Sequence, residues 1–457
     1  MAGAKVDLSR LIDGQKFNGF HVWIIFWCFL VQLADGFDIN AAAYVAPALV
    51  KEWHLNRADL GPLFSAGLSA GFFGPLFFGF IADRYGRRLS IIAGTFVFGI
   101  FTVASVLATS LGQLIVLRFL AGLGMSGALP MTVALVNEFA PRRIRATLVI
   151  VMFSGSTFGG GVPGPFASWL VPTHGWQILF WIGGILPLVL TALLVFALPE
   201  SVKFLALRPA RRGELLKTLD RMGLSRSVPN DSDFVIGGEA NRGRFSLRPL
   251  FEGRLALLTP FLWLCFAITT MSFYFINSWM PTILTGNGVP LERAVYATTL
   301  FSFGGTLGAW VIMRPFDRYG FIPVTILYLC AIPIVASIGL PGLSETGIMA
   351  MVAAAGFCLL GLNFGNIAAA GNIYPTEIRG FGVGSAFFIG RIGSVIGPLV
   401  GGLLIARQVT TQHIFFLFAV PIVVAALASM VVVRLYWRQY QSTSREEVPL
   451  TVLANAK

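Results

Sequence analysis

Twelve long apolar runs dominate this sequence of 457 residues and leave few folds open to it. They cover about residues 22–48, 59–82, 89–109, 111–137, 146–170 and 176–198, and then 256–284, 293–315, 321–341, 346–372, 381–406 and 412–436. A helix needs roughly 20 apolar residues to cross a bilayer. Charged residues make up only 12% of the chain, against about 25% in soluble domains. The sequence therefore predicts an all-α membrane protein with twelve transmembrane helices.

The runs form two sets of six that carry the same landmarks at one spacing. The letters DRYGRR begin at Asp83 and DRYGFI at Asp317, 234 positions later. PRRIR from Pro141 returns as PTEIR from Pro375, again 234 positions later. Such a repeat indicates two pseudo-symmetric six-helix bundles with a site between them near the bilayer midplane.

We expect five segments: an N-terminal segment (1–21), a first bundle (22–198), a linker (199–254), a second bundle (255–437) and a tail (438–457). Arginine and lysine concentrate in the even-numbered connections and the linker, which predicts cytoplasmic termini by the positive-inside rule. We expect a solvated basic linker near anionic headgroups, with a short amphipathic helix near residues 211–222. The polar first twenty or so residues show no cleavable signal peptide.

The net charge of +12 is explained by the same basic connections, so no nucleic-acid partner is expected. All four cysteines fall in apolar runs without CxxC or Cys/His spacing, which favours small core residues over disulfides or metal ligands. No GxxxxGK[ST] or HExxH motif occurs. We therefore expect no enzyme activity, no metal and no cofactor other than coupling protons.

Two aspartates interrupt the first apolar run, in LADGFDIN (33–40). Asp35 and Asp38 are three positions apart, which puts both carboxylates on one face of a helix. One Asp at the centre of a membrane helix costs roughly 2.5–3.5 kcal/mol, and close carboxylates raise each other's affinity for a proton. The pair predicts a proton-binding site inside a transporter.

Three more charged side chains lie in or at the end of apolar runs. Arg118 opens RFLAGLG in the fourth run and must pair or reach water, with snorkelling as the alternative. Glu138 ends that run and either pairs with Arg142 or Arg145 or relays protons. Arg391, near the centre of the eleventh run, is too deep to snorkel. We expect it to bind an anion, either an acid of this protein or a substrate carboxylate.

The seventh and tenth runs carry aromatic and amide side chains that can orient a small aromatic or oxygenated solute. The segments read FYFINSWMP (273–281) and GLNFGNIAAAGN (361–372). The candidates are Tyr274, Asn277, Trp279, Asn363 and Asn366. Core packing or a place in the interface belt is the alternative for the aromatic residues.

The connection after the second run reads GFIADRYGRR (79–88), and DRYG returns at 317–320. Its glycines allow a tight turn, Asp83 can face a helix N-terminus, and the arginines can bond across helices. The pattern resembles motif A of the major facilitator superfamily, which is a conformational latch. The matching latch residues are Gly79, Asp83, Arg84, Gly86, Arg87, Arg88, Asp317, Arg318 and Gly320.

Five segments carry a second resemblance: DGFD (35–38), RFLAGLG (118–124), LPES (198–201), YPTEIRGFGVG (374–384) and GRIGSVIGP (390–398). Through them, nearly the whole chain is similar to the aromatic acid:proton symporter family. The resemblance implies a protein of the bacterial inner membrane that imports benzoate-like or hydroxybenzoate-like anions with protons by alternating access. It assigns the acidic pair to Asp35 and Asp38, and coupling or binding charges to Arg118, Glu138 and Arg391. We expect a monomer.

Three alternatives remain open. The solute could be a sugar or polyol, or a non-aromatic carboxylate such as muconate. A sugar site would rely on amides and tryptophan rather than on a buried arginine. A third alternative belongs to a different class of protein: a membrane chemoreceptor or channel for aromatic acids. Net accumulation of the solute against its gradient would indicate a carrier instead.

Overall fold

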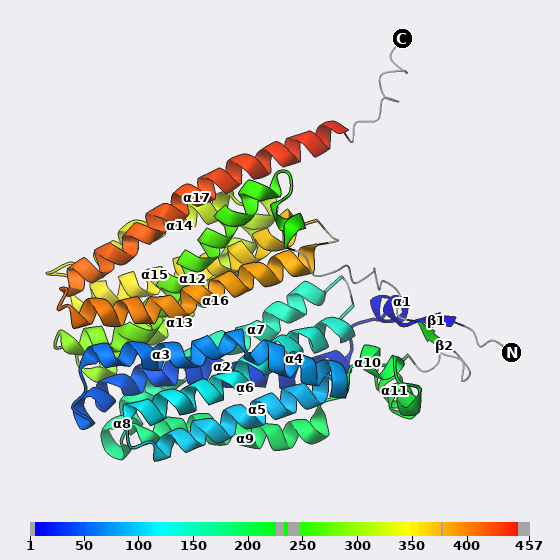
Figure 1. The fold of residues 1–457 in the computed structure, drawn as a ribbon, viewed down its shortest axis with the longest axis horizontal. Coiled ribbons are helices and arrows are strands. Elements are labelled where there is room, and N and C mark those ends of the chain that lie inside the picture. Colours follow the sequence, from blue (N-terminus) through cyan, green and yellow to red (C-terminus); the bar gives the residue numbers. More distant parts are fainter. Residues whose placement is uncertain (1–4, 142, 225–232, 236–246, 376–377, 447–457) are drawn as a thin grey trace, which may run out of the picture. The chain divides into compact units, whose positions relative to one another are not determined.

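The computed structural model describes residues 5–141, 143–224, 233–235, 247–375 and 378–446 (Figure 1). The long helices of the first half are α2 (Gly19–Glu52), α3 (Leu60–Ser69), α4 (Gly74–Tyr85), α5 (Arg87–Ala104), α6 (Leu111–Phe139), α7 (Arg145–Gly161), α8 (Pro163–His174) and α9 (Gln177–Ala197). Those of the second half are α12 (Leu255–Gly286), α13 (Leu291–Tyr319), α14 (Ile322–Ser337), α15 (Glu345–Ile373), α16 (Arg379–Ala406) and α17 (Thr411–Glu446). The short elements are β1 (Lys5–Asp7), α1 (Leu8–Asp13), α10 (Val202–Ala206), α11 (Arg212–Arg221) and β2 (Asp233–Val235).

In the described residues, eleven helical segments are long and apolar enough to cross a membrane, and α14 is a shorter apolar helix at the predicted ninth crossing. Two crossings are broken: a 3-10 turn at Ala70–Phe72 separates α3 from α4, and α7 gives way to α8 at Val162. Neighbouring helices can satisfy the backbone groups freed at such breaks. The prediction of an all-α membrane fold is confirmed, with one two-stranded pairing added.

The 234-residue repeat extends to the helix boundaries. Helices α6, α7 and α9 begin 234 positions before α15, α16 and α17, respectively. Ser110 and Ser344 are N-cap residues whose side chains accept from the backbone N–H three positions later. Arg145 and Arg379 each donate from Nε, over 3.3 Å, to the carbonyl five positions earlier. The same sequence signals therefore produce the same local structure in both halves.

Contacts divide the chain into two units: residues 1–243 with 277–302, and residues 244–276 with 303–457. This division differs from the predicted boundary at 255, because the end of α12 and the start of α13 pack within the first unit. The Trp279 ring centre lies 5.2 Å from that of Phe64 in α3. A Cβ on Gly164 of α8 would overlap the Thr299 hydroxyl of α13. The predicted domain boundaries were placed from the sequence repeat, whereas the two units are defined by which helices pack together.

Glycines bring α2 and α7 close together in the first unit. A Cβ on Gly36 of α2 would overlap the backbone carbonyl of Ser156, and one on Gly159 of α7 would overlap that of Leu33. Small residues allow this approach of two membrane helices. The contact fixes the height and rotation of the segment that carries Asp35 and Asp38.

The N-terminal segment and the linker fold together at what we call the Gly86 end of the first unit, where α4 meets α5 and where α6 and α9 end. Strands β1 and β2 pair in parallel. Leu8 and Ile12 of α1 share a buried cluster with Leu215 and Leu219 of α11 and with bundle residues. The predicted amphipathic helix is present as α11. Six apolar side chains of residues 202–224 are buried in that cluster, whereas Leu207, Lys203 and Lys217 are exposed, so this part of the linker is solvated on one side only.

Asn18 joins this assembly to α2. Its side-chain oxygen caps α2 by accepting from the N–H groups of Phe20 (3.2 Å) and His21 (3.4 Å). Its Nδ2 donates to the carbonyl of Met222, just after α11, over 3.0 Å. Gln15 Nε2 donates to the same carbonyl over 2.6 Å. One amide side chain therefore connects the start of α2 to the end of the linker helix.

Asn18→Ala removes both the cap and the bond to Met222. Caps and single hydrogen bonds each contribute about 1 kcal/mol, so we expect the melting temperature of the purified protein to fall measurably. Asn372→Ala is the matched control, since Asn372 is an exposed asparagine near the end of α15. Equal melting temperatures for the two variants would contradict the role assigned to Asn18.

Candidate functional site

A buried ion pair lies inside the first unit. Asp38 of α2 and Arg118 of α6 meet at 2.6 Å between Oδ1 and Nη1. The Arg118 side chain is only 4% exposed, so it does not snorkel to an interface. Removing one partner of such a pair leaves an uncompensated buried charge, which is strongly unfavourable. The sequence predicted both residues but not that they bind each other.

Two neutral residues complete the surroundings of Arg118. Its Nη2 donates to Thr102 Oγ1 of α5 over 2.9 Å. Its guanidinium carbon lies 4.9 Å from the ring centre of Phe180 in α9, within the range of a cation–π interaction. Neither residue was predicted, because one threonine and one phenylalanine in apolar runs carry no distinguishing signal. Only helix packing brings α5, α6 and α9 to one guanidinium.

Asp35 has a different neighbour from Asp38. Ser156 of α7 donates its hydroxyl to Asp35 Oδ2 over 3.4 Å. The two acids therefore contact different helices, although they lie less than one turn apart on α2. The sequence predicted that the two close carboxylates would raise each other's affinity for a proton. The charge in direct contact with Asp38 is the guanidinium of Arg118, at 2.6 Å.

Arg391 lies on α16 in the second unit and is half-buried. Its guanidinium has no hydrogen-bond or ion-pair partner among the described residues. The preceding carbonyl, that of Gly390, accepts from Thr270 of α12 over 2.7 Å. In the 234-residue repeat, Gly390 corresponds to Ser156, which contacts Asp35. Arg391 therefore lies along its own unit at the level that the acid pair occupies in the first.

The membrane-embedded charges Asp35, Asp38 and Arg118 are not repeated in the second half. The positions 234 residues after Asp35, Asp38 and Arg118 hold Thr, Ser and Val. The position 234 residues before Arg391 holds Thr157. The two halves therefore share a scaffold but carry different chemistry, with acids in the first and, in the second, a guanidinium that has no partner among the described residues.

The candidate solute-binding residues have different environments. Trp279 and Asn277 are buried in the first unit, and Asn277 Nδ2 has no hydrogen-bond partner in the described part of the chain. The Tyr274 ring centre lies 5.2 Å from that of Phe273, edge to face. Asn363 is half-buried on α15. Their contact with a solute stays a prediction.

Asn366 belongs to a buried polar network in the second unit. Its Nδ2 donates to the hydroxyl of Tyr328 (2.9 Å) and to Thr269 Oγ1 (3.2 Å). The Tyr328 hydroxyl donates to the carbonyl of Cys265 over 3.1 Å. The network joins α15 to α12 and α14, which gives Asn366 a packing role, and its contact with a solute also stays a prediction.

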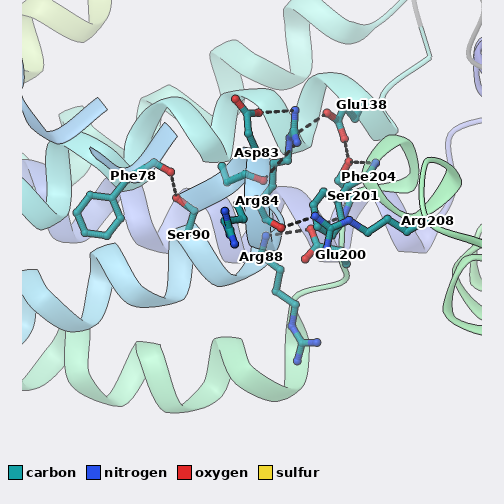
Figure 2. A network of polar contacts seen from close by, with 12 residues as sticks. Phe78, Asp83, Arg84, Arg88, Ser90, Glu138, Glu200, Ser201, Phe204 and Arg208 are labelled. Carbon is teal, nitrogen blue, oxygen red and sulfur yellow. Dashed lines mark hydrogen bonds and ion pairs between the residues drawn. The ribbon is translucent and has the colours of Figure 1, made fainter. Parts of the chain in front are cut away.

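At the Gly86 end, the first motif-A copy contacts LPES (Figure 2). Gly86 has φ of 111°, and a Cβ there would overlap the Glu200 carboxylate. Glu200 Oε1 accepts from the N–H groups of Arg88 (3.2 Å) and Ser201 (2.9 Å). The expectation that Asp83 faces a helix N-terminus is therefore corrected: Glu200 occupies the N-terminus of α5, where a negative charge is stabilised.

Asp83 is 72% exposed and lies 3.7 Å from the Arg87 guanidinium. Arg87 also lies 3.5 Å from Glu138 Oε1, and Glu138 Oε2 accepts from the Ser201 hydroxyl. Pairing with Arg142 or Arg145 was one of the two alternatives for Glu138, beside a role in proton relay. Arg145 instead lies 3.4 Å from Asp13, and Arg142 lies outside the described residues. Glu138 thus connects α6 to α5 and to the segment after α9.

Two backbone contacts extend the first motif-A copy. The Arg88 side chain donates to the carbonyl of Val195, and Arg208 donates to the carbonyl of Arg84. Gly79, by contrast, has open space around it.

The second motif-A copy keeps the turn and loses the ion pairs. Gly320 has φ of 61°, 234 positions after Gly86. The Arg318 guanidinium lies 5.2 Å from the Tyr319 ring centre. Within the described residues, no ion pair involves Asp317 or Arg318. The turn is therefore common to both halves, and the polar network is a property of the first.

Other chemistry has little support in the described residues. They contain no group of three or more His, Cys, Asp or Glu side chains that could hold a metal. Residues 67–71 read GLSAG, the letters of a hydrolase nucleophile turn. However, Ser69 ends helix α3, and its hydroxyl donates to the Ala66 carbonyl over 2.7 Å. Three cysteines are buried as predicted, and Cys330 is exposed.

Residues 28–370 match the model of the Major Facilitator Superfamily. The chain belongs to this superfamily. A gallate transporter of Pseudomonas putida is 34% identical over 93% of this chain and 94% of its own length. The 4-hydroxybenzoate transporter PcaK of Pseudomonas aeruginosa is 33% identical over 93% of this chain and 95% of its own. The resemblance predicted from the motifs is confirmed: this superfamily member is a multi-pass membrane transporter and not an enzyme.

Solved structures agree with the fold. The inward-open xylose transporter XylE from E. coli has a TM-score of 0.70 at 17% identity, covering 90% of this chain and 96% of that one. A bacterial homolog of the human lysosomal transporter Spinster has a TM-score of 0.69 at 17% identity, covering 93% and 99%. Both show the major facilitator fold for this chain. Its bacterial relatives agree with the predicted location in the inner membrane.

Gly86→Ala forces a side chain into a positive-φ turn and against Glu200. We expect a clear fall in melting temperature and in transport, because strain at such a position costs of order 1–3 kcal/mol. Gly79→Ala, in the same motif, is the matched control, since nothing lies within 4 Å of its Cβ position. A Gly86→Ala protein as stable and active as Gly79→Ala would refute this description of the turn.

Proposed function

We propose that this transporter is a proton-coupled symporter that imports a small aromatic carboxylate by alternating access. The observation that carries the proposal is the buried pair of Asp38 and Arg118, in a chain whose 33–34% identical relatives are named for gallate and 4-hydroxybenzoate. The pair supplies a proton acceptor, and the relatives supply the solute class.

Protonation of Asp38 changes the site more than protonation of an exposed acid would. In the charged state, Asp38 and Arg118 neutralise each other at 2.6 Å. Adding a proton to Asp38 leaves a buried positive charge on Arg118, which then favours helix arrangements that bring an anion or water to it. One proton is thereby converted into a preference between two conformations.

Arg391 is the proposed partner of the substrate carboxylate. It is a half-buried arginine inside a transmembrane helix, without a partner among the described residues. A guanidinium binds a carboxylate through two parallel hydrogen bonds, a geometry that a sugar hydroxyl does not match. Tyr274, Asn277, Trp279, Asn363 and Asn366 remain candidates for contacts with the ring and its substituents, and Glu138 for proton relay.

Coupling requires that the proton and the substrate each bind the two conformations unequally. With acids in the first half and Arg391 in the second, one ligand binds to each half. If only the conformation that has bound both the proton and the substrate changes from outward-open to inward-open, the two cross the membrane together. Exchange of substrate at equal pH needs only the substrate site, so it separates binding from proton coupling.

The direct test is uptake of labelled 4-hydroxybenzoate into proteoliposomes driven by an imposed pH gradient. We expect Asp38→Asn and Asp35→Asn to abolish accumulation, because neither amide can take up and release the proton. Asp38→Asn should retain substrate exchange at equal pH. Asp59→Asn is the control, since Asp59 is an exposed acid and should leave accumulation intact. Full proton-driven accumulation in both Asp35→Asn and Asp38→Asn would overturn the proposal.

Arg391→Ala should raise the KM for 4-hydroxybenzoate by about tenfold or more, because a charged hydrogen bond contributes about 1.5–3 kcal/mol. Arg391→Lys should recover part of the affinity, since it restores the charge without the fork geometry. Competition by xylose and muconate tests the sugar and non-aromatic alternatives. Uptake that Arg391→Ala leaves unchanged would favour a sugar, and failure to accumulate solute in any condition would favour a channel or receptor.

A further inference from the structure

We propose that Thr102 and Phe180 are positioning residues that hold the Arg118 guanidinium in place while Asp38 gains and loses its proton. This inference deepens the proposed function and rests on it. It concerns the two neutral neighbours of the arginine, which no sequence motif includes.

Three neighbours surround one guanidinium. Nη1 bonds Asp38, Nη2 bonds Thr102 Oγ1 over 2.9 Å, and the ring centre of Phe180 lies 4.9 Å from the central carbon. Nε is buried and has no partner in the described part of the chain. Thr102 and Phe180 are themselves completely buried. Neither contact is open to solvent in this structure.

The packing also sets which way Thr102 points. A Cβ on Gly183 of α9 would lie 3.7 Å from Thr102 Cγ2, in ordinary contact, and 3.1 Å from the Phe37 ring. The methyl group of Thr102 therefore faces α9, and its hydroxyl faces Arg118. Phe180 is held in turn by Trp176, with ring centres 5.8 Å apart and edge to face. Both neighbours of the arginine are oriented by contacts that do not involve Asp38.

This orientation has a consequence for protonation. When Asp38 becomes neutral, Arg118 loses its counter-charge but keeps a hydroxyl acceptor and a ring face. The hydroxyl and the ring contact the guanidinium in both states, but they supply a larger share of its stabilisation once Asp38 is neutral, so they make Asp38 easier to protonate. Without them, Asp38 would be the remaining partner of Arg118 among the described residues, and protonation would require a more acidic medium.

No other charge in the described first unit competes with Arg118 for this role. Helix α2 itself carries Asp35 less than one turn away, with Cys28 and Tyr44 further along. The elements packed on α2 carry titratable groups only at their ends, apart from Arg118. These groups are Arg145 at the start of α7, Glu138 at the end of α6, His174 at the end of α8, and Glu292, Arg293 and Tyr296 near the start of α13. Helices α3 and α9 and residues 277–286 of α12 carry none.

The test measures initial uptake of labelled 4-hydroxybenzoate as a function of outside pH in proteoliposomes of the full-length protein. Thr102→Val keeps the shape and removes the acceptor. We expect the pH of half-maximal uptake to fall by about one unit, which corresponds to about a tenfold change in proton affinity. Thr102→Ser restores the acceptor and should return the midpoint to the wild-type value. Phe180→Leu should shift the midpoint in the same direction, through loss of the ring face.

Thr95→Val is the matched control. Thr95 is a completely buried threonine two turns earlier on α5, and its hydroxyl bonds Ile91 in its own helix over 2.8 Å. Phe98→Leu is the corresponding control for Phe180, since Phe98 is also buried. Both controls should keep the wild-type midpoint, whatever their effect on expression or maximal rate.

The possible results distinguish a failure of this inference from a failure of the proposed function. If Thr102→Val and Phe180→Leu lower uptake equally at every pH and leave the midpoint unchanged, the residues only pack and the inference fails. If Thr102→Val does not fold, Phe180→Leu and Thr102→Ser still decide it. If Asp38→Asn keeps proton-driven accumulation, the proposed function fails, regardless of what happens at Thr102.

Discussion

The first unit depends on one opposite-charge contact inside an apolar bundle. Two ions that would each be costly in the membrane neutralise each other where α2 and α6 meet, at 2.6 Å. The contact exists because glycines allow α2 to lie against α7, and because α5 and α9 supply a hydroxyl and a ring to the same arginine. Helix packing therefore determines the chemistry of the site.

Helices α5 and α6 are joined twice. Arg87 and Glu138 link them at the Gly86 end, and Thr102 and Arg118 link them deep in the bundle. Arg87 and Thr102 are 15 residues apart, about 22 Å along a helix. Gly94 and Gly124 pack between these two links, each against the backbone of the other helix. The two links and the glycine contacts between them hold α5 and α6 together along most of α5.

The repeat shows which features belong to the scaffold. Capping serines, arginine-to-carbonyl bonds and positive-φ glycines recur 234 positions apart. The acids, their arginine and the Glu200 contact do not recur. The second half instead carries Arg391 and the buried Asn366 network. The two halves thus share one bundle design, while each half holds membrane-embedded charges of its own.

The sequence by itself determined the class, the repeat and most of the charged residues. Apolar length sets the number of crossings, and the cost of membrane charge marks Asp35, Asp38, Arg118 and Arg391 as exceptional. Tertiary structure alone decided the partners. Asp38 binds Arg118, Glu138 binds Arg87, and Glu200 occupies the helix end expected for Asp83. Partners lie on helices far apart in the chain, and a pattern within one helix carries no information about which neighbour faces it.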